Sequence, residues 1–236
     1  MKTREFTEKE NFANMLISVL AHDLRQPFAT FIMFVDMIKH TQQVLSQDEL
    51  YMTLENMRDT ATKGIEFLDG LLYWIKTESE GYTYQTERLP LGALIDEANG
   101  LYYYEQKIKD LTLVNTIDNE QLIYAHKQML QFINRNLLSN ATKFSKTGGA
   151  INVSCTNNKG WITVAINNQG DSLSAERLER LFNIHEPGYA TGNHRIEGAG
   201  IALSICKDMI NRMNGRLWAE SIVGDGTTFY YSLPII

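Results

Sequence analysis

A histidine and an aspartate stand next to each other at His22 and Asp23, inside a strongly patterned segment. Apolar residues recur there at steps of three or four, which predicts one apolar stripe along a helix: Leu16, Leu20, Leu24, Phe28, Phe31, Val35 and Ile38. His22 lies two residues after Leu20 and two before Leu24. At ~100° per residue it therefore points away from the stripe, toward solvent. A solvated imidazole with a near-neutral pKa can act as a nucleophile, and Asp23 can orient or deprotonate its ring.

The backbone beside this histidine is also unusual, because Pro27 has no N–H to give to the carbonyl of Asp23. The helix is therefore expected to be weakened or kinked at this point. Taken alone, a His-Asp pair on a helix is more often an ordinary surface histidine beside an ordinary aspartate.

Two asparagines and a lysine form a second candidate group, in a segment predicted to be helical over Lys127–Thr142. Asn136, Asn140 and Lys143 are spaced by four and three residues, so they share one helix face. Asparagine carbonyls are hard oxygen donors that suit Mg²⁺, and a lysine one turn further suits a polyphosphate. Asparagine is a poor helix former, so two on one face need an explanation. Spacing alone still favours a pair of solvated or capped side chains.

Glycine-containing segments follow in the C-terminal half of the chain: Asn168-Gln169-Gly170, Glu197-Gly198-Ala199-Gly200 and Gly224-Asp225-Gly226-Thr227-Thr228-Phe229. Glycines let a backbone approach a phosphate closely, and the start of a helix offers N–H groups and a dipole that favour anions. A lone Gly-x-Gly is usually only a turn, so each segment by itself carries little weight.

The part of the chain that must position His22 is expected to be helical throughout, over residues 1–78. Ser46 and Glu49 form a capping box that predicts the start of a second helix. Two helices with one broad apolar face each cannot bury both faces alone, so we expect two hairpins to pair as a homodimeric four-helix bundle. The alternative is a hairpin that packs only on its own C-terminal domain. The second stripe comprises Leu50, Leu54, Met57, Ala61, Ile65, Leu68, Leu72 and Ile75.

A second domain is expected over residues 84–236, after a linker at 79–83. Pro90 suits the first turn of a helix over Leu91–Tyr104, and a further helix is expected over Ile201–Met213. This order predicts an α+β chain whose second domain is an α/β sandwich, with a mixed sheet covered by helices on one face. The expected strands are Leu111–Val114, Gln121–Tyr124, Ile151–Cys155, Trp161–Ile166, Arg216–Ala219 and Thr227–Leu233.

Composition excludes several classes of function. The chain has 236 residues, 44% of them hydrophobic, and a net charge of −6, which fits a globular protein and argues against a nucleic-acid binder. Cys155 and Cys206 have neither metal-type nor redox-type spacing, which predicts small buried residues in a reducing compartment. No apolar run reaches the ~20 residues that span a bilayer, and the N-terminus is charged rather than signal-like. We expect a cytoplasmic fragment of a longer receptor with no membrane contact of its own, which leaves open a membrane-anchored full-length protein.

The string His22-Asp23-Leu24-Arg25-Gln26-Pro27-Phe28 resembles the H-box of sensor histidine kinases, with Phe28 in place of the usual leucine. Asn136-Leu137-Leu138-Ser139-Asn140-Ala141-Thr142-Lys143-Phe144-Ser145 resembles the N-box of the same family and is the most specific motif in the chain. The three glycine segments follow in the family's order. Phe182 matches the aromatic residue of the family's F-box, and the segment between Phe182 and Gly198 matches the lid over ATP.

The resemblance covers nearly the whole chain. It implies a dimerisation and histidine-phosphotransfer hairpin at residues 1–78 and a catalytic ATP-binding domain of the Bergerat (GHKL) type at residues 84–236. The implied cofactors are ATP and Mg²⁺. The implied partners are a second copy of the chain and the receiver domain of a response regulator.

The same resemblance implies a role for each matching residue. His22 accepts the γ-phosphoryl group, Asp23 orients the ring and takes its proton, and Gln26 is the candidate for phosphatase activity toward the regulator. Asn140, with Asn136, holds the metal, and Asn168 stands where the family has the acid that binds the amino group of adenine. The implied nucleotide contacts are Asn136, Asn140, Lys143, Phe144, Asn168, Gly170, Phe182, Gly198, Gly200 and Thr228.

The chain departs from the family pattern at Asn168, which replaces an acid, and at Ser172 and Ala202, which replace glycines. These departures support an alternative function, a pseudokinase that dimerises and binds nucleotide as a signalling scaffold. A gyrase-like or chaperone-like ATPase is a further alternative, but such a protein has no reason to carry an H-box on a helical hairpin.

Overall fold

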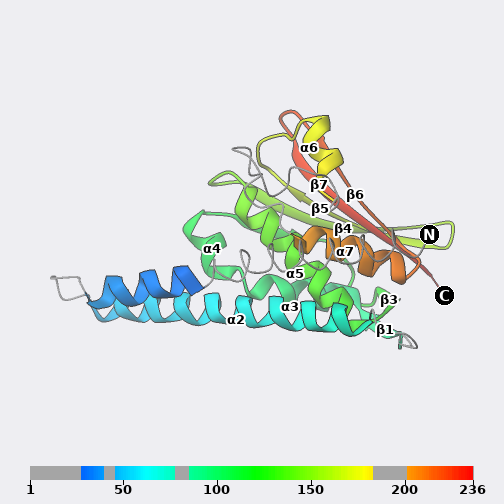
Figure 1. Ribbon diagram of the computed structural model, residues 1–236. Coiled ribbons are helices and arrows are strands. Elements are labelled where there is room, and N and C mark those ends of the chain that lie inside the picture. The colour runs from blue at the N-terminus through cyan, green and yellow to red at the C-terminus, as the bar shows by residue number, and fades with distance from the viewer. Residues whose placement is uncertain (1–27, 40–45, 78–84, 183–200, 236) are drawn as a thin grey trace, which may run out of the picture. The chain divides into compact units, whose positions relative to one another are not determined.

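The computed structural model describes residues 28–39, 46–77, 85–182 and 201–235 (Figure 1). The chain divides into two compact units, one mainly of residues up to Asp69 and the other mainly of residues from Gly70 onward. His22, Asp23 and Gln26 lie outside the described residues. No helix among the described residues is both long and apolar enough to cross a membrane.

The N-terminal part is helical over residues 28–39 and over α2, Gln47–Thr77. The capping box expected at the start of α2 is confirmed: the Glu49 amide donates to Ser46 Oγ at 3.2 Å, and Glu49 Oε2 accepts from the Ser46 amide at 2.8 Å. The bond from the Ser46 backbone, and after it one that the Ser46 hydroxyl donates to the same carboxylate oxygen at 2.8 Å, lower the pKa of the Glu49 carboxyl. Many apolar side chains of both helices are exposed, among them Phe28, Ile32, Met33, Leu54, Ile65 and Leu72.

The described residues of the C-terminal part form two sheets. β1 (Glu87–Pro90) pairs antiparallel with β3 (Leu122–Ala125) as a two-stranded sheet. The larger sheet has five strands in the order β2-β4-β5-β7-β6, and β2 and β4 run parallel whereas the other neighbours run antiparallel. The mixed sheet expected from the sequence is therefore confirmed. The bounds of its strands are Thr112–Asn115 for β2, Ala150–Asn158 for β4, Trp161–Asn168 for β5, Arg216–Ile222 for β6 and Gly226–Pro234 for β7.

Helices pack against one face of this sheet, as Figure 1 shows for α5 and α7. Side chains alternate along β5: Ile162, Val164 and Ile166 are buried against the helices, while the residues between them face the other side. This two-layer arrangement confirms the α/β sandwich. The helices are α3 (Leu91–Gly100), α4 (Tyr103–Ile108), α5 (Lys127–Phe144), α6 (Ala175–Arg180) and α7 (Ile201–Arg212).

Two local expectations were wrong or incomplete. The helix expected over Leu91–Tyr104 ends at Gly100, because the Tyr102 amide turns back to the Asn99 carbonyl at 2.9 Å and the Tyr102 hydroxyl reaches the carbonyl of Arg135 at 3.0 Å. Glycine is also a poor helix former, which favours a break at Gly100. The short elements β1 and α6 were not expected, because four and six residues are too few to show a clear apolar period.

Candidate nucleotide site

Helix α5 carries the two asparagines and the lysine of the second candidate group. Its apolar side is buried, whereas Asn136 and Asn140 are half-buried and Lys143 is exposed. The Asn136 amide nitrogen donates to the Phe132 carbonyl at 2.8 Å, so its Oδ1 remains for another partner. Asn140 makes no side-chain hydrogen bond to any residue that the structure describes. The side of α5 thus offers two amide oxygens that the fold itself does not use.

These amide oxygens fit a magnesium ion better than a transition metal. Within the described ranges no group of three His, Cys, Asp or Glu side chains could hold a metal. Mg²⁺ characteristically takes one or two protein oxygens and fills its other positions with water and substrate phosphates. Asn136 and Asn140 are the residues of α5 that could supply such oxygens.

The C-terminal end of α5 is held by a lysine from a distant segment. Lys109 Nζ donates to the carbonyls of Thr142, Lys143 and Ser145 at 3.0, 2.6 and 3.3 Å. A cation at this position satisfies carbonyls that have no partner within the helix and opposes the negative end of its dipole. Sequence reasoning missed Lys109, because nothing in its local pattern shows which helix it reaches.

The end of β5 meets the end of α5 at Gly170. A Cβ added to Gly170 would lie 2.1 Å from the Phe144 carbonyl oxygen and 2.8 Å from Asn168 Nδ2, so only glycine fits there. Gly226 has φ +88°, and a Cβ on it would lie 1.9 Å from the Asn168 carbonyl oxygen. The two glycines therefore bring three segments into backbone contact around Asn168, which is itself only 2% exposed.

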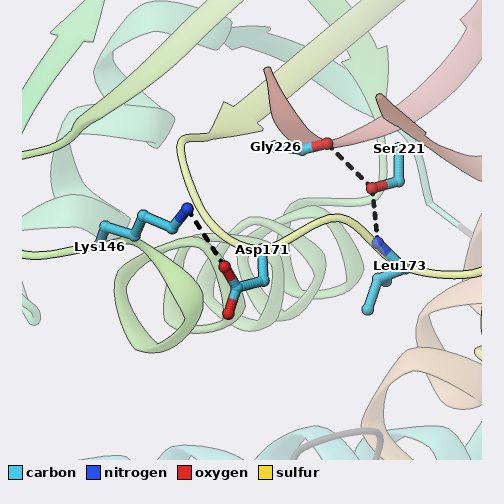
Figure 2. Close-up of polar contacts among 5 residues, drawn as sticks. All are labelled: Lys146, Asp171, Leu173, Ser221 and Gly226. Atoms are coloured by element: carbon cyan, nitrogen blue, oxygen red, sulfur yellow. Dashed lines mark hydrogen bonds and ion pairs between the residues drawn. The ribbon is translucent and has the colours of Figure 1, made fainter. Parts of the chain in front are cut away.

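A serine links the segment after Gly170 to the β6–β7 hairpin (Figure 2). Ser221 Oγ accepts from the Leu173 amide at 2.8 Å and donates to the Gly226 carbonyl at 2.9 Å. At the other end of the segment, Lys146 pairs with Asp171 at 3.2 Å, but both side chains are largely exposed and this pair contributes little. Ser221 was also missed from the sequence, since it lies outside every glycine segment.

The structure does not bring Thr228 to this group. Asn167 Nδ2 donates to Thr228 Oγ1 at 3.0 Å, and the two residues are cross-strand partners on the face of the sheet opposite Asn168. Thr227 is the partner of Asn168 and is buried. Because successive strand residues face opposite sides, Thr227 and not Thr228 shares the face of Asn168.

Phe182 lies next to the face of β7 that carries Thr227 and Phe229. Its ring is 6.4 Å from that of Phe229 in an edge-to-face arrangement, and Lys207 Nζ of α7 is 5.9 Å from the Phe182 ring centre. Phe144, at the end of α5, is 42% exposed, with Lys143 Nζ 5.5 Å from its ring centre. Gly198, Gly200 and the segment expected to form the lid lie outside the described residues.

A buried polar pair joins α5 to β7 in the core. The Tyr231 hydroxyl donates to Asn134 Oδ1 at 3.0 Å, and both residues are fully buried. Burial raises the pKa of the Tyr231 hydroxyl well above its ordinary value, so it stays a neutral donor. This bond fixes the helix that carries Asn136 and Asn140 to the strand that follows Gly226.

Comparison with known proteins agrees with this geometry. Residues 125–236 match the family described as histidine kinase-, DNA gyrase B- and HSP90-like ATPases. Over 227 residues, 93% of the chain, it is 29% identical to the adaptive-response sensory kinase SasA of Rippkaea orientalis. Over 241 residues, 98% of the chain, it is 26% identical to the sensor protein SrrB of Staphylococcus aureus. The chain is thus similar over nearly its whole length to two-component sensor kinases, and its residues 125–236 match the ATPase family that includes them.

Solved structures with the same fold are similar to this chain over nearly all of its length. The chain is similar over its full length to 66% of histidine kinase ThkA, crystallised with the response regulator protein TrrA, with a TM-score of 0.60 and 19% identity. It is also similar over 94% of its length to 45% of full-length ShkA in complex with AMPPNP, with a TM-score of 0.59 and 14% identity. The chain spans 57% of the SasA relative and 40% of SrrB.

Proposed function

We propose that this kinase core transfers the γ-phosphoryl group of ATP to His22 and from there to an aspartate of a response regulator. The single observation that carries the proposal is the meeting of the N-box helix, the Asn168–Gly170 segment and Gly226 in one place. These segments are far apart in the sequence, and each alone would be an ordinary helix or turn. Their contact supports one nucleotide site built from all of them.

Within that site, each part has a separate task. Asn168 binds the base, and the exposed Lys143 pairs with the polyphosphate. Asn140 and Asn136 hold Mg²⁺ through their amide oxygens, and the ion neutralises phosphate charge when bound. Gly198 and Gly200, which precede α7 in the sequence, are proposed to offer backbone N–H groups to the phosphates, because the start of a helix attracts anions.

The transfer itself needs a neutral imidazole. A ring nitrogen of His22 forms a bond to the γ-phosphorus while the bond to the bridging β,γ-oxygen breaks, and ADP leaves with that electron pair. The ring then loses its proton to Asp23, which also orients it. Positioning and neutralisation of charge account for most of the acceleration in such a reaction.

The proposed partners are a second copy of the chain and a receiver domain. Exposed apolar side chains on α2, such as Leu54, Ile65 and Leu72, support a homodimeric helical bundle. The crystallised complex of ThkA with TrrA supports docking of a receiver domain on a kinase of this fold. Gln26 is proposed to help remove the phosphoryl group from that regulator.

Incubation with γ-labelled ATP and Mg²⁺ tests this function. The label should survive alkali and be lost in acid, as an N–P bond requires, and His22→Gln should abolish it while nucleotide still binds. His40→Gln is the matched control and should label normally. Asn140→Ala should reduce labelling through the loss of metal binding, with little change in stability. Nucleotide binding without label on the wild-type chain would instead favour the pseudokinase scaffold.

A further inference from the structure

Asn168 and Asn167 are adjacent asparagines in very different situations. The amide of Asn167 is fixed, because its nitrogen donates to both Thr228 Oγ1 and the Asp225 carbonyl, at 3.0 and 3.3 Å. The side chain of Asn168 makes no hydrogen bond within the part of the chain that the structure describes, although the residue is 2% exposed. The amide atoms of Asn168 are not among the fully buried unpaired side-chain atoms of the described residues, so this amide can be reached by a group from outside the protein.

The neighbours of Asn168 do not fix which end of its amide points outward. Gly170, whose backbone lies against Asn168 Nδ2, has no side chain. Thr227, its cross-strand partner, has its hydroxyl 3.0 Å from Ser221 Oγ. Ser221 gives its own proton to the Gly226 carbonyl, so the proton between the two hydroxyls comes from Thr227. No hydrogen bond among the described residues therefore holds the Asn168 amide in one of its two orientations.

Amide reversal matters because purines differ at the atom attached to C6. Adenine carries an amino group there, which donates, whereas hypoxanthine and guanine carry an oxygen, which accepts. A carboxylate only accepts and suits the amino group alone. An amide presents its oxygen to the amino group in one orientation and its nitrogen to the keto oxygen in the other.

We infer that Asn168 makes this a purine site that accepts 6-keto as well as 6-amino nucleotides. The inference rests on the proposed function, since it assumes that Asn168 faces C6 of a bound nucleotide base. An aspartate at the same position would reject the keto oxygen, because two acceptors would face each other in a desolvated place. Asn168 in place of the family's acid thus changes the selectivity between 6-amino and 6-keto purines. It also removes the negative charge that would strengthen a hydrogen bond from the amino group.

The test compares ADP with IDP by calorimetry on the full chain. These nucleotides have the same sugar and phosphates and differ at C6 and the adjacent ring nitrogen, which avoids the extra 2-amino group of guanine. The wild-type chain should bind both within about tenfold of each other, since each makes one neutral hydrogen bond to the amide. Asn168→Asp should increase the preference for ADP over IDP by at least about tenfold, because the carboxylate would face the keto oxygen of IDP and both groups only accept hydrogen bonds.

Two further variants make the result decisive. Asn152→Asp adds the same charge at an exposed position of β4 and should leave the ADP-to-IDP ratio unchanged. Asn168→Ala should weaken both nucleotides alike, which keeps the test valid if the aspartate variant does not fold. The inference is overturned if the wild-type chain prefers ADP to IDP by more than about tenfold, or if Asn168→Asp leaves the ADP-to-IDP affinity ratio unchanged. In either case, binding of ADP still preserves the proposed function. Absence of binding by either nucleotide overturns both.

Discussion

Replacing Gly170 by alanine is a severe test of how the nucleotide site is built. The added Cβ would lie 2.1 Å from the Phe144 carbonyl oxygen and 3.1 Å from its carbonyl carbon, so the obstacle is backbone and cannot rotate away. Overpacking typically costs ~1–3 kcal/mol, and a backbone obstacle places Gly170→Ala near the upper limit. For a domain of this size, that loss lowers the melting temperature by about 6–12 °C.

The same substitution should also weaken nucleotide binding, because the strand end that moves carries Asn168. Thermal unfolding followed by circular dichroism measures the first effect, and calorimetric titration with ADP measures the second. Gly100→Ala is the matched control: it has no neighbouring atom within 4 Å of the new Cβ and lies at the end of α3, where alanine favours the helix. If Gly170→Ala melts and binds ADP like Gly100→Ala, the contact between the end of β5 and the end of α5 is not as described.

Other predictions concern the supports of the site and the dimer. Lys109→Met removes the donor to three carbonyls at the end of α5 and should lower the free energy of unfolding by about 1–2 kcal/mol and weaken ADP binding. An unchanged midpoint in chemical denaturation would contradict this capping role. Tyr231→Phe leaves Asn134 Oδ1 without its partner and should cost about 1–3 kcal/mol near pH 7. Because the pKa of Tyr231 is raised in the folded state, its stabilising contribution is complete below the ordinary tyrosine pKa of about 10 and is lost as the pH rises further. Tyr231→Phe should therefore lose less stability than wild type between neutral pH and strongly alkaline pH, and parallel losses would refute this. Leu72→Lys on α2 should shift the chain from dimer to monomer in light scattering, and a persistent dimer would argue against the helical bundle.

The sequence predicted those features that depend on neighbours along the chain. The capping box at Ser46 and Glu49 needs only local spacing, and the common face of Asn136, Asn140 and Lys143 follows from the helical period alone. Alternation likewise marked the strands of the larger sheet. Resemblance to a family then identified which ordinary-looking segments belong to one site.

The features that the sequence could not provide depend on register and on distant contacts. A choice between Thr227 and Thr228 requires the pairing of β5 with β7, since one step along a strand reverses the face. Lys109 and Ser221 act on segments far from their own positions, and neither belongs to a recognisable motif. The free amide of Asn168 is a property of what surrounds it, which no local pattern contains.

Mapping the phosphoryl group by mass spectrometry, after incubation with ATP and Mg²⁺ and with alkaline handling throughout, shows directly whether His22 is the phosphoryl acceptor. We expect one modified peptide, which contains His22 and loses the phosphoryl group in acid. The same peptide should stay unmodified in His22→Gln, although that variant still binds ADP. A phosphoryl group on any other residue, or none on a chain that binds ATP, would contradict the assignment of this chain as an active histidine kinase.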